Sequence, residues 1–267
     1  MLRVGLAGLG AVGLEVARRL EQGIPGLTLA AVSVRDVSKA QSKVAKIGAE
    51  IPNVALTELP QHCDVIVEGL PKAPFAEIAR ATIYAGKVFM PLSVGQLLEN
   101  WDLIDRAKET GARILVPTGA LIGLDAVRAA AEGDIRSVTM ITRKPPGGLE
   151  GAPYLVQNNI SLHGLNEAKK VFDGSAREGA RGFPANVNVA AALSLAGIGP
   201  DKTRLQIWAD PQVTRNTHRI EVDADTASFS MMIENVPSVE NPRTGKITAL
   251  SAVAMLRGLT ATLKVGT

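Results

Sequence analysis

Three glycines near the start of the chain have the spacing of a phosphate-binding turn. They form the pattern G-x-G-x-x-G between a short apolar run and a segment with helical periodicity. In such a turn the first glycine permits the tight bend, the second lets the backbone approach a pyrophosphate, and the third lets helix and strand pack closely. The N–H groups at the start of the helix add a partial positive charge. We therefore predict a dinucleotide site, with a ligand-free glycine turn as the alternative. The predicted contacts are Gly8, Gly10, Ala11, Val12 and Gly13.

The end of the second predicted strand, in the segment "SVRD", bears on the choice of cofactor. An acid at this position usually binds the ribose hydroxyls of NAD, whereas an arginine can pair with the extra phosphate of NADP. The chain offers both, as Arg35 and Asp36. We predict that both contact the cofactor, NAD or NADP; the alternative for Asp36 is that it caps the following helix.

Histidine is the residue type best suited to move a proton near neutral pH during hydride chemistry on a carbon that bears an amine or hydroxyl. His218 lies at the start of a predicted strand, directly after a polar loop. It is either the catalytic base or an ordinary histidine at a strand edge. His62 is predicted to be structural, and His163, before a predicted helix, a capping or surface residue.

Further polar residues stand where predicted elements begin or end. Asn186 and Asn188 open an apolar helix, and a buried amide there would need a partner such as a nicotinamide carboxamide or a substrate; two ordinary helix-start asparagines are the alternative. Arg143 and Lys144 end a strand before two prolines, where they either bind a dicarboxylate or are solvated. Asn241 lies in another proline-containing loop and has the same two interpretations.

Strands and helices alternate through the first 120 residues, so the glycine turn and the segment SVRD sit on a predicted parallel sheet covered on both faces. The expected strands have the sequences LRVGLAG, LTLAAVSV, CDVIVEGL, VFMPLSV and RILVPTG. The expected helices lie over residues 11–22, 36–48, 73–87 and 97–112. A glycine turn after the first strand of such a sheet is a much more specific signal than the same pattern alone.

The second half of the chain does not continue the alternation of strands and helices. A helix is expected over residues 123–133, a strand over 135–144, and helical segments over 165–183 and 184–197. Three further strands at meander spacing follow, which indicates a mainly antiparallel sheet. The fold class is therefore α/β: a Rossmann-type parallel sheet with a second, smaller α+β domain inserted before the C-terminal helix. The predicted boundaries are 1–118 joined by 245–267, and 119–244, with the reaction in the cleft between the domains.

Composition excludes several other classes of protein. The chain has 267 residues, 46% apolar, with a net charge of +3 and scattered basic residues. Only 3% of its residues are aromatic, so no nucleic-acid surface is indicated. Cys63 is the only cysteine, and the three histidines lie far apart in the sequence, so neither a disulfide nor a metal site is expected. No apolar run is long enough to span a membrane. We expect a cytoplasmic protein.

Several long segments resemble those of L-aspartate dehydrogenases, in the same order and over nearly the whole chain. They are GLAGLGAVG, SVG at 93–95, TGALIGLDAV, TRKPP, FPANVNVAAALSLAGIG, NTHRI and ENPRTGKITALSA. Members of that family oxidise L-aspartate to iminoaspartate with NAD or NADP and run the reverse amination of oxaloacetate with ammonia; some supply NAD biosynthesis. The resemblance implies that His218 is the catalytic histidine, that Asn188 contacts the nicotinamide side of the cofactor, and that the chain forms a homodimer or higher oligomer. It also implies a cofactor contact at Ile122. We further predict cofactor contacts at Ser93 and Ala120, and substrate contacts at Lys144, Asn186 and Asn241.

The sequence departs from the family pattern at a few positions near the expected substrate. Gln96 and Ile122 replace small residues, and Gly69 and Pro71 stand where small residues of another pattern are usual. A different small amino or 2-oxo acid, handled by a dehydrogenase or imine reductase, is therefore the alternative substrate. A dinucleotide sensor without catalysis is a third hypothesis.

Overall fold

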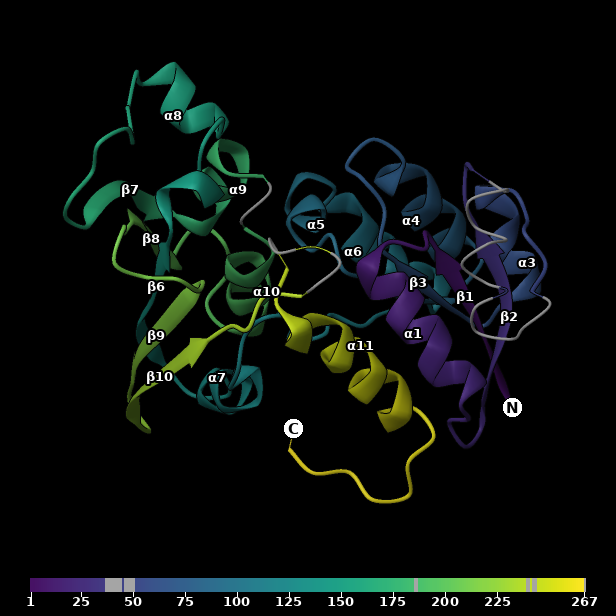
Figure 1. The fold of residues 1–267 in the computed structure, drawn as a ribbon. Coiled ribbons are helices and arrows are strands. Elements are labelled where there is room, and N and C mark those ends of the chain that lie inside the picture. The colour runs from purple at the N-terminus through teal and green to yellow at the C-terminus, as the bar shows by residue number, and fades with distance from the viewer. Residues whose placement is uncertain (37–44, 46–50, 185–186, 239–240, 242–243, 267) are drawn as a thin grey trace. The chain divides into compact units, whose positions relative to one another are not determined.

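The computed structural model describes residues 1–36, 45, 51–184, 187–238, 241 and 244–266. The chain divides into two compact units (Figure 1). Unit 1 is Met1–Pro117 with Thr248–Lys264, and unit 2 is Thr118–Ile247 with the residues after Lys264. The predicted helix over residues 36–48 lies almost entirely outside the described residues.

Unit 1 is built on a parallel sheet with the strand order β2-β1-β3-β4-β5. Its strands are β1 (Leu2–Ala7), β2 (Leu27–Ser33), β3 (Val65–Glu68), β4 (Val88–Pro91) and β5 (Arg113–Ile114). Its helices are α1 (Ala11–Glu21), α3 (Leu59–His62), α4 (Phe75–Tyr84), α5 (Gly95–Glu99), α6 (Asp102–Thr110) and α11 (Lys246–Gly258), with a 3₁₀ turn at Leu56–Glu58. β2 lies on one side of β1, whereas β3, β4 and β5 follow on the other side, so the order in which strands are added reverses between β1 and β3. In doubly wound folds, ligands bind at the carboxyl ends of the strands beside such a switch point.

The core of unit 1 joins both ends of the chain. Val4, Leu6 and Val16, from β1 and α1, pack in one apolar cluster with Ala252 and Leu256 of α11. All five residues are buried because β1 is apolar from Val4 to Ala7 and each helix presents an apolar stripe. The C-terminal helix therefore completes the parallel-sheet unit, and unit 2 is an insertion before it, as the sequence predicted.

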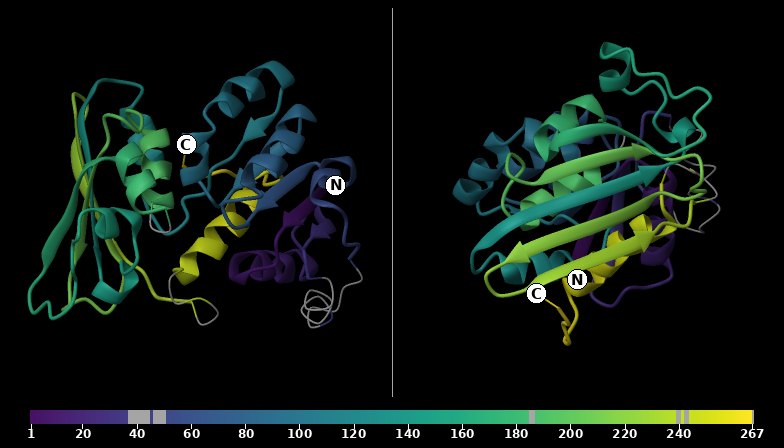
Figure 2. Two further views of the ribbon diagram at one scale, coloured as in Figure 1. Left: turned by 90° about the horizontal axis from the view of Figure 1, so that it is seen from above. Right: turned by 90° about the vertical axis from the view of Figure 1, so that its left-hand side faces the viewer.

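Unit 2 contains a mixed sheet with the order β10-β9-β6-β8-β7. Its strands are β6 (Ile135–Lys144), β7 (Lys169–Ser175), β8 (Arg204–Ala209), β9 (Thr217–Ala224) and β10 (Ser228–Glu234). Its helices are α7 (Leu124–Ala130), α8 (Pro153–Gln157), α9 (Ala176–Gly182) and α10 (Asn188–Ala196), with a 3₁₀ turn at Pro146–Gly148. Only the β6–β8 pair is parallel; the other three pairs are antiparallel. Figure 2 shows helices of this unit against one face of the sheet, and the opposite face in the right-hand view.

Two helix predictions are wrong. The segment over residues 97–112 is not one helix, because the chain breaks at Asn100, whose side-chain amide donates to the carbonyl of Gln96 at 2.9 Å and ends α5. The segment over residues 165–183 is not helical throughout, because its middle forms β7. There the ring of Phe172 packs edge-on against Tyr154 and Phe183, with ring centroids 5.2 and 5.5 Å apart. This packing outweighs the helical propensity of the flanking residues.

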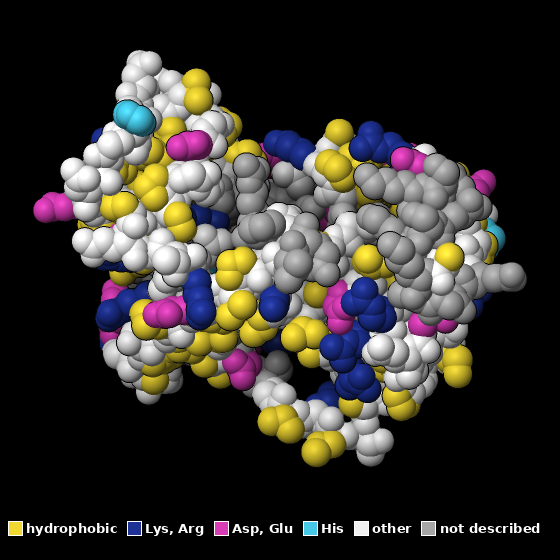
Figure 3. Space-filling view, viewed as in Figure 1, with side chains coloured by type: hydrophobic (Ala, Val, Ile, Leu, Met, Phe, Trp, Pro, Cys, Tyr) yellow, Lys and Arg dark blue, Asp and Glu magenta, His cyan; other side chains and the backbone are white. Residues whose placement is uncertain are grey.

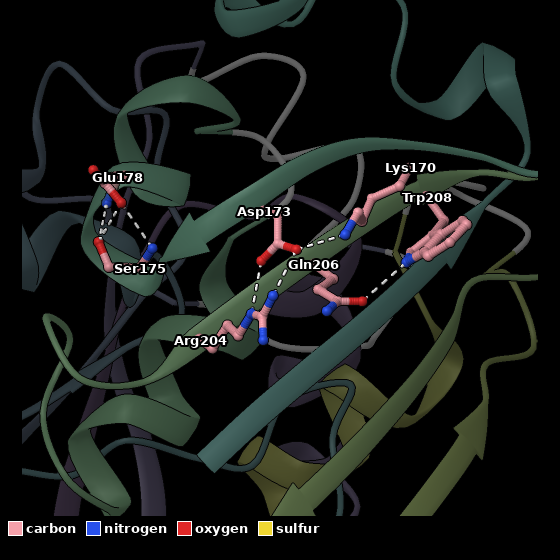
Figure 4. Close-up of polar contacts among 7 residues, drawn as sticks. All are labelled: Lys170, Asp173, Ser175, Glu178, Arg204, Gln206 and Trp208. Atoms are coloured by element: carbon pink, nitrogen blue, oxygen red, sulfur yellow. Dashed lines mark hydrogen bonds and ion pairs between the residues drawn. The ribbon is translucent and has the colours of Figure 1, made fainter. Parts of the chain in front are cut away.

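The junction between β7 and α9 has a clear local cause (Figure 4). Ser175 accepts a hydrogen bond from the backbone N–H of Glu178, and the Glu178 carboxylate accepts one from the backbone N–H of Ser175 at 2.8 Å. This reciprocal arrangement is a capping box, which satisfies two backbone donors that the helix leaves free. On the outer side of the strand, Arg204 and Lys170 donate to Asp173 at 2.6–2.8 Å and lower the pKa of Asp173 to about 2.

Charged side chains of both signs are interspersed on the face drawn in Figure 3. On α1, for example, Arg18 and Arg19 both form ion pairs with Glu15. No helix in the part of the chain that the structure describes is long and apolar enough to cross a membrane.

Candidate active site

The glycine turn lies between β1 and α1 and has the geometry that close packing demands. Gly8 has a φ of +98°, which favours glycine, and its N–H donates to the carbonyl of Ser33 at 2.9 Å. A Cβ on Gly13 would lie 2.2 Å from the carbonyl oxygen of Gly8. A Cβ on Gly10, by contrast, would meet no atom within 4 Å. The first and third glycines thus satisfy steric needs of the protein, whereas the second leaves open space.

That open space belongs to a cavity of about 830 Å³ in unit 1. Its walls come from the glycine turn, the end of β2, the segment before α3 and the loop after β3. The lining residues are Gly8, Leu9, Gly10, Ser33, Val34, Arg35, Asn53, Val54, Ala55, Leu56, Gly69, Leu70, Pro71, Pro74 and Glu77. The size and the bare backbone at Gly10 fit a dinucleotide whose pyrophosphate approaches the start of α1. The residues present therefore fit this cofactor.

Arg35 and Asp36 follow β2, and both are exposed. Arg35 lines the cavity beside Asn53. The Asn53 side-chain oxygen accepts a hydrogen bond from the N–H of Val34 at 3.0 Å, so it fixes the backbone that carries Arg35. Ala11 and Val12, at the start of α1, are half-buried. The structure thus gathers the predicted contacts of the turn and of the β2 end around the carboxyl end of the unit 1 sheet.

Ser93 follows β4, and its hydroxyl lies 3.0 Å from Oε1 of Glu68 and 3.1 Å from the carbonyl oxygen of Leu70. Glu68 ends β3 and is fully buried. Glu68 is not among the residues predicted from the sequence to take part in a site, although a carboxylate at the end of a buried apolar strand is an unusual signal.

The second candidate cluster lies in unit 2, where β6 and β9 pair antiparallel. Thr142 and His218 are directly opposite each other in the register, and the Thr142 hydroxyl lies 3.0 Å from Nδ1 of His218. Lys144, two residues further along β6, shares the face of Thr142 because side chains alternate along a strand. All three side chains are buried, with 2%, 3% and 6% of the residue surface exposed for Thr142, His218 and Lys144.

Burial sets the protonation of this cluster. It lowers the pKa of His218 to about 3, with a second contribution from the charge of Lys144. It also lowers the pKa of Lys144 to about 8. Both shifts disfavour the charged forms, as expected for bases removed from water. At neutral pH the imidazole is therefore neutral and Lys144 is still mostly an ammonium.

The adjacent cation Arg143 has a separate position. Its guanidinium donates to the buried carboxylate of Asp210 at 2.9 Å and lies 5.1 Å from the ring centroid of Trp208. Arg143 and Lys144 thus point to opposite faces of the sheet. The sequence left open whether these two cations bind a dicarboxylate or are solvated. Lys144 is buried, so it is not a solvated surface lysine.

The other predicted residues of unit 2 are spread over its loops and helix ends. Asn188 is the first residue of α10 and is exposed, whereas Asn186 lies outside the described residues. Ala120 and Ile122 are half-buried before α7, and the carbonyl of Ala120 accepts from Asn235 at 3.0 Å. Asn241 is exposed, and its amide donates to Thr244 within its own loop.

The remaining histidines take no part in a cluster. His62 ends α3 and His163 lies in a loop, and both are exposed. The expected helix after His163 is absent, since the next element is β7. Among the described residues, no group of three or more His, Cys, Asp or Glu side chains could hold a metal ion.

Comparisons with known proteins bear on both units. A family model described as "Homoserine dehydrogenase, NAD binding domain" matches residues 8–117, and one described as "Aspartate dehydrogenase, C-terminal" matches residues 125–259. A crystal structure of aspartate dehydrogenase from Thermotoga maritima superimposes with a TM-score of 0.76 at 22% identity, with complete coverage of both chains. Scyllo-inositol dehydrogenase from Lactobacillus casei, with bound NAD(H), gives a TM-score of 0.53 at 14% identity over 97% of this chain and 87% of that one. The parallel sheet, the glycine turn and these matches define an NAD(P)-dependent dehydrogenase.

Relatives with known names narrow this class. L-aspartate dehydrogenase of Bradyrhizobium diazoefficiens is 56% identical over 266 residues, which cover 100% of this chain and 94% of the relative. L-aspartate dehydrogenase 3 of Bordetella bronchiseptica is 53% identical over 267 residues, which cover 100% and 98%. The chain belongs to the aspartate dehydrogenase family.

Proposed function

We propose that this protein oxidises L-aspartate to iminoaspartate, which hydrolyses to oxaloacetate, and that it catalyses the reverse reductive amination with ammonia. Its relatives of 56% and 53% identity carry the name L-aspartate dehydrogenase over the whole length of this chain. The structural observation that carries the proposal is the buried group of Thr142, Lys144 and His218. It combines a cation for a carboxylate with an imidazole for proton transfer.

The cofactor is NAD or NADP, which supplies the hydride acceptor when bound. The glycine turn, with Ala11 and Val12 at the start of α1, would hold the pyrophosphate, and Arg35 and Asp36 the adenosine ribose. Ser93, Ala120, Ile122 and Asn188 are proposed as contacts towards the nicotinamide.

In the proposed reaction, Lys144 binds a substrate carboxylate through its ammonium group. A carboxylate beside Lys144 and His218 favours the charged form of both bases, so substrate binding raises the pKa of each. His218 then accepts, at Nε2, a proton from the substrate ammonium group or from the attacking water. Its Nδ1–H donates to Oγ1 of Thr142, which stabilises the imidazolium. Asn186 and Asn241 are proposed as further substrate contacts.

Replacement of His218 tests this assignment directly. We expect His218→Ala to lower kcat by about 10²–10⁴, the usual contribution of a general base, with an unchanged Kd for the dinucleotide. His163→Ala, at the exposed histidine of the same unit, is the control and should leave both quantities unchanged. Full activity of the His218→Ala protein would show that His218 is not the base.

A substrate panel tests the amino acid. Gln96 and Ile122 differ from the small residues usual in the family, so a different small amino or 2-oxo acid is the second candidate substrate. The panel is run with NAD and NADP, in the amination direction with ammonia. Turnover of oxaloacetate well above other 2-oxo acids supports the first proposal. Tight NAD(P)H binding without turnover of any acid would instead indicate a sensor.

Assembly as a homodimer or a higher oligomer, in the cytoplasm, is part of the same proposal. In β8 the half-buried Trp208 alternates with the buried Ile207 and Ala209 and so lies on the opposite face of the sheet from them, and the exposed side chain of Met232 in β10 is a further apolar group. Light scattering of the full chain measures the oligomeric state.

A further inference from the structure

The buried carboxyl group of Glu68 is not explained by the proposed chemistry. Its residue surface is 0% exposed, at the last position of β3. The pKa of this carboxyl is raised above its ordinary value, because the effect of burial exceeds that of the hydrogen bonds from Leu70 and Ser93, which lower it. No lysine, arginine or histidine of the described residues forms an ion pair with it. A buried carboxylate without a cation is costly unless hydrogen bonds replace those that it made to water.

Three donors surround the two oxygens of Glu68. Oε1 accepts from the N–H of Leu70 at 2.7 Å and lies 3.0 Å from the hydroxyl of Ser93, whose single hydrogen also has the carbonyl oxygen of Leu70 within reach at 3.1 Å. Oε2 accepts from the N–H of Ser93 at 3.1 Å. Only a carboxylate accepts both N–H bonds well, since each N–H donates to a different oxygen and the hydroxyl oxygen of a carboxylic acid is a poor acceptor. One side chain therefore joins the loop after β3 to the loop after β4.

The first of these loops is a wall of the dinucleotide cavity. Gly69, Leu70 and Pro71 line the cavity together with the glycine turn. The N–H of Gly69 donates to the carbonyl of Ala7 at 3.0 Å. A Cβ on Gly8 would lie 2.9 Å from the carbonyl oxygen of Gly69, so the wall and the turn are already in contact. A shift of this loop would change the shape of the cavity.

We propose that ionised Glu68 is a positioning residue for the cofactor, which holds the Gly69–Pro71 wall and Ser93 in the conformation that binds the dinucleotide. The inference rests on the proposed cavity in unit 1 and not on the assignment of His218. It assigns Glu68 no contact with substrate or cofactor.

Glutamine in place of Glu68 isolates the charge, because it keeps the size of the side chain. An amide has one acceptor oxygen and one NH₂ donor, so in either orientation its NH₂ faces a backbone N–H, that of Leu70 or that of Ser93. The loop must then move to find another acceptor, and cofactor binding has to restore it. We expect Glu68→Gln to raise the Kd for NADH or NADPH about tenfold. Glu68→Asp keeps the charge but shortens the reach, and should give an intermediate Kd.

The control is Ile83→Val, which removes a methyl group from the fully buried face of α4, away from the cavity residues. It should lower Tm and leave the Kd unchanged. Direct titration of each full-length variant with NADH and NADPH gives the Kd, and hydrogen exchange of residues 69–71 reports the loop. Faster exchange there in Glu68→Gln than in Ile83→Val is expected. If Glu68→Gln does not fold, the Kd and the hydrogen exchange of Glu68→Asp test the proposal instead.

The outcomes separate this inference from the proposed function. If the wild-type protein binds a dinucleotide and both Glu68 variants bind it as tightly, Glu68 is only a structural residue and the inference fails alone. If the wild-type protein binds neither NADH nor NADPH, the cavity assignment fails and the inference fails with it.

Discussion

The hydroxyl of Thr142 lies 3.0 Å from Nδ1 of His218, across directly paired positions of β6 and β9. The bond fixes the ring against rotation and leaves Nε2 as the nitrogen for proton exchange. Thr142→Val keeps the shape of the side chain and removes the bond. We expect kcat to fall about fivefold with an unchanged Kd for the cofactor, since a buried hydrogen bond contributes about 1 kcal/mol. Steady-state kinetics check this.

Two variants control for this substitution. Thr142→Ser keeps the hydroxyl and should restore most of the activity. Thr139→Val, on the same strand but opposite Glu221, should have no effect on kcat. An equal loss in Thr142→Val and Thr142→Ser would mean that packing, not the hydrogen bond, is what matters.

The depressed pKa of His218 makes the protein sensitive to acid. The histidine has a pKa of about 3 in the folded protein and 6.5 without burial. Between these values the unfolded chain binds a proton that the folded protein does not, so stability falls as the pH drops from 6.5 to 3. The full effect is on the order of 5 kcal/mol. The Tm of His218→Gln should therefore fall less steeply over this range than that of the wild-type protein. Parallel curves would contradict the shift.

Lys144 predicts a pH dependence in the alkaline range. Its pKa of about 8 means that the ammonium is present below pH 8 and is lost above it. A dicarboxylate without an amino group, such as succinate, serves as a competitive inhibitor whose own charge is constant there. Its Ki should rise above pH 8, approaching about tenfold per pH unit. Lys144→Met should weaken succinate at pH 7 and remove this dependence, whereas Lys202→Met, at an exposed lysine of the same unit, should leave it unchanged.

Arg35 and Asp36 predict the choice of cofactor. Arg35→Ala removes a partner for the 2′-phosphate, so the Kd for NADPH should rise about tenfold while that for NADH changes little. Asp36→Ala should raise the Kd for NADH more than that for NADPH, because the ribose hydroxyls of NADH lose an acceptor. Titrations of both variants and of Arg113→Ala, at an exposed arginine outside the cavity, measure this. Equal losses for both nucleotides in Arg35→Ala would exclude a 2′-phosphate contact.

A substitution at Gly10 should weaken cofactor binding without affecting the stability of the fold. A Cβ there meets no protein atom within 4 Å, so Gly10→Ala should keep the wild-type Tm. The added methyl group points into the space that the pyrophosphate needs, and the Kd for NADH should rise at least about tenfold. Gly258→Ala, whose Cβ is equally unhindered in α11, is the control. A Kd unchanged by Gly10→Ala would place the pyrophosphate elsewhere.

Much of unit 1 could be predicted from the sequence, because parallel strands and their helices leave local patterns. The buried runs, the glycine spacing and the residues after β2 each depend on neighbours in the chain. The break at Asn100 was missed, since a side-chain bond to the helix end competes with a strong helical pattern there. The start of α9 carried a recognisable signal, Ser175 followed by Glu178 three positions later.

The site residues that were missed depend on register and burial. Thr142 matters because β6 and β9 pair so that it faces His218, and a sequence does not show which strands pair or in what register. Glu68 matters because two separate loops direct N–H groups at it. Lys144 was found as a cation beside prolines, but its burial, which lowers its pKa, follows only from the face of the sheet on which it lies.

Because α11 packs against β1 and α1, unit 1 can complete its core only after α11 has been synthesised. β1 and α1 are synthesised well before Ala252 and Leu256, which complete the apolar cluster that they start. During translation, part of the interior of unit 1 therefore stays uncovered until α11 has been made, whereas nearly all of the sequence of unit 2 is available earlier. Unit 1, whose first strands are made before unit 2, therefore completes its core after nearly all of the sequence of unit 2 has been made.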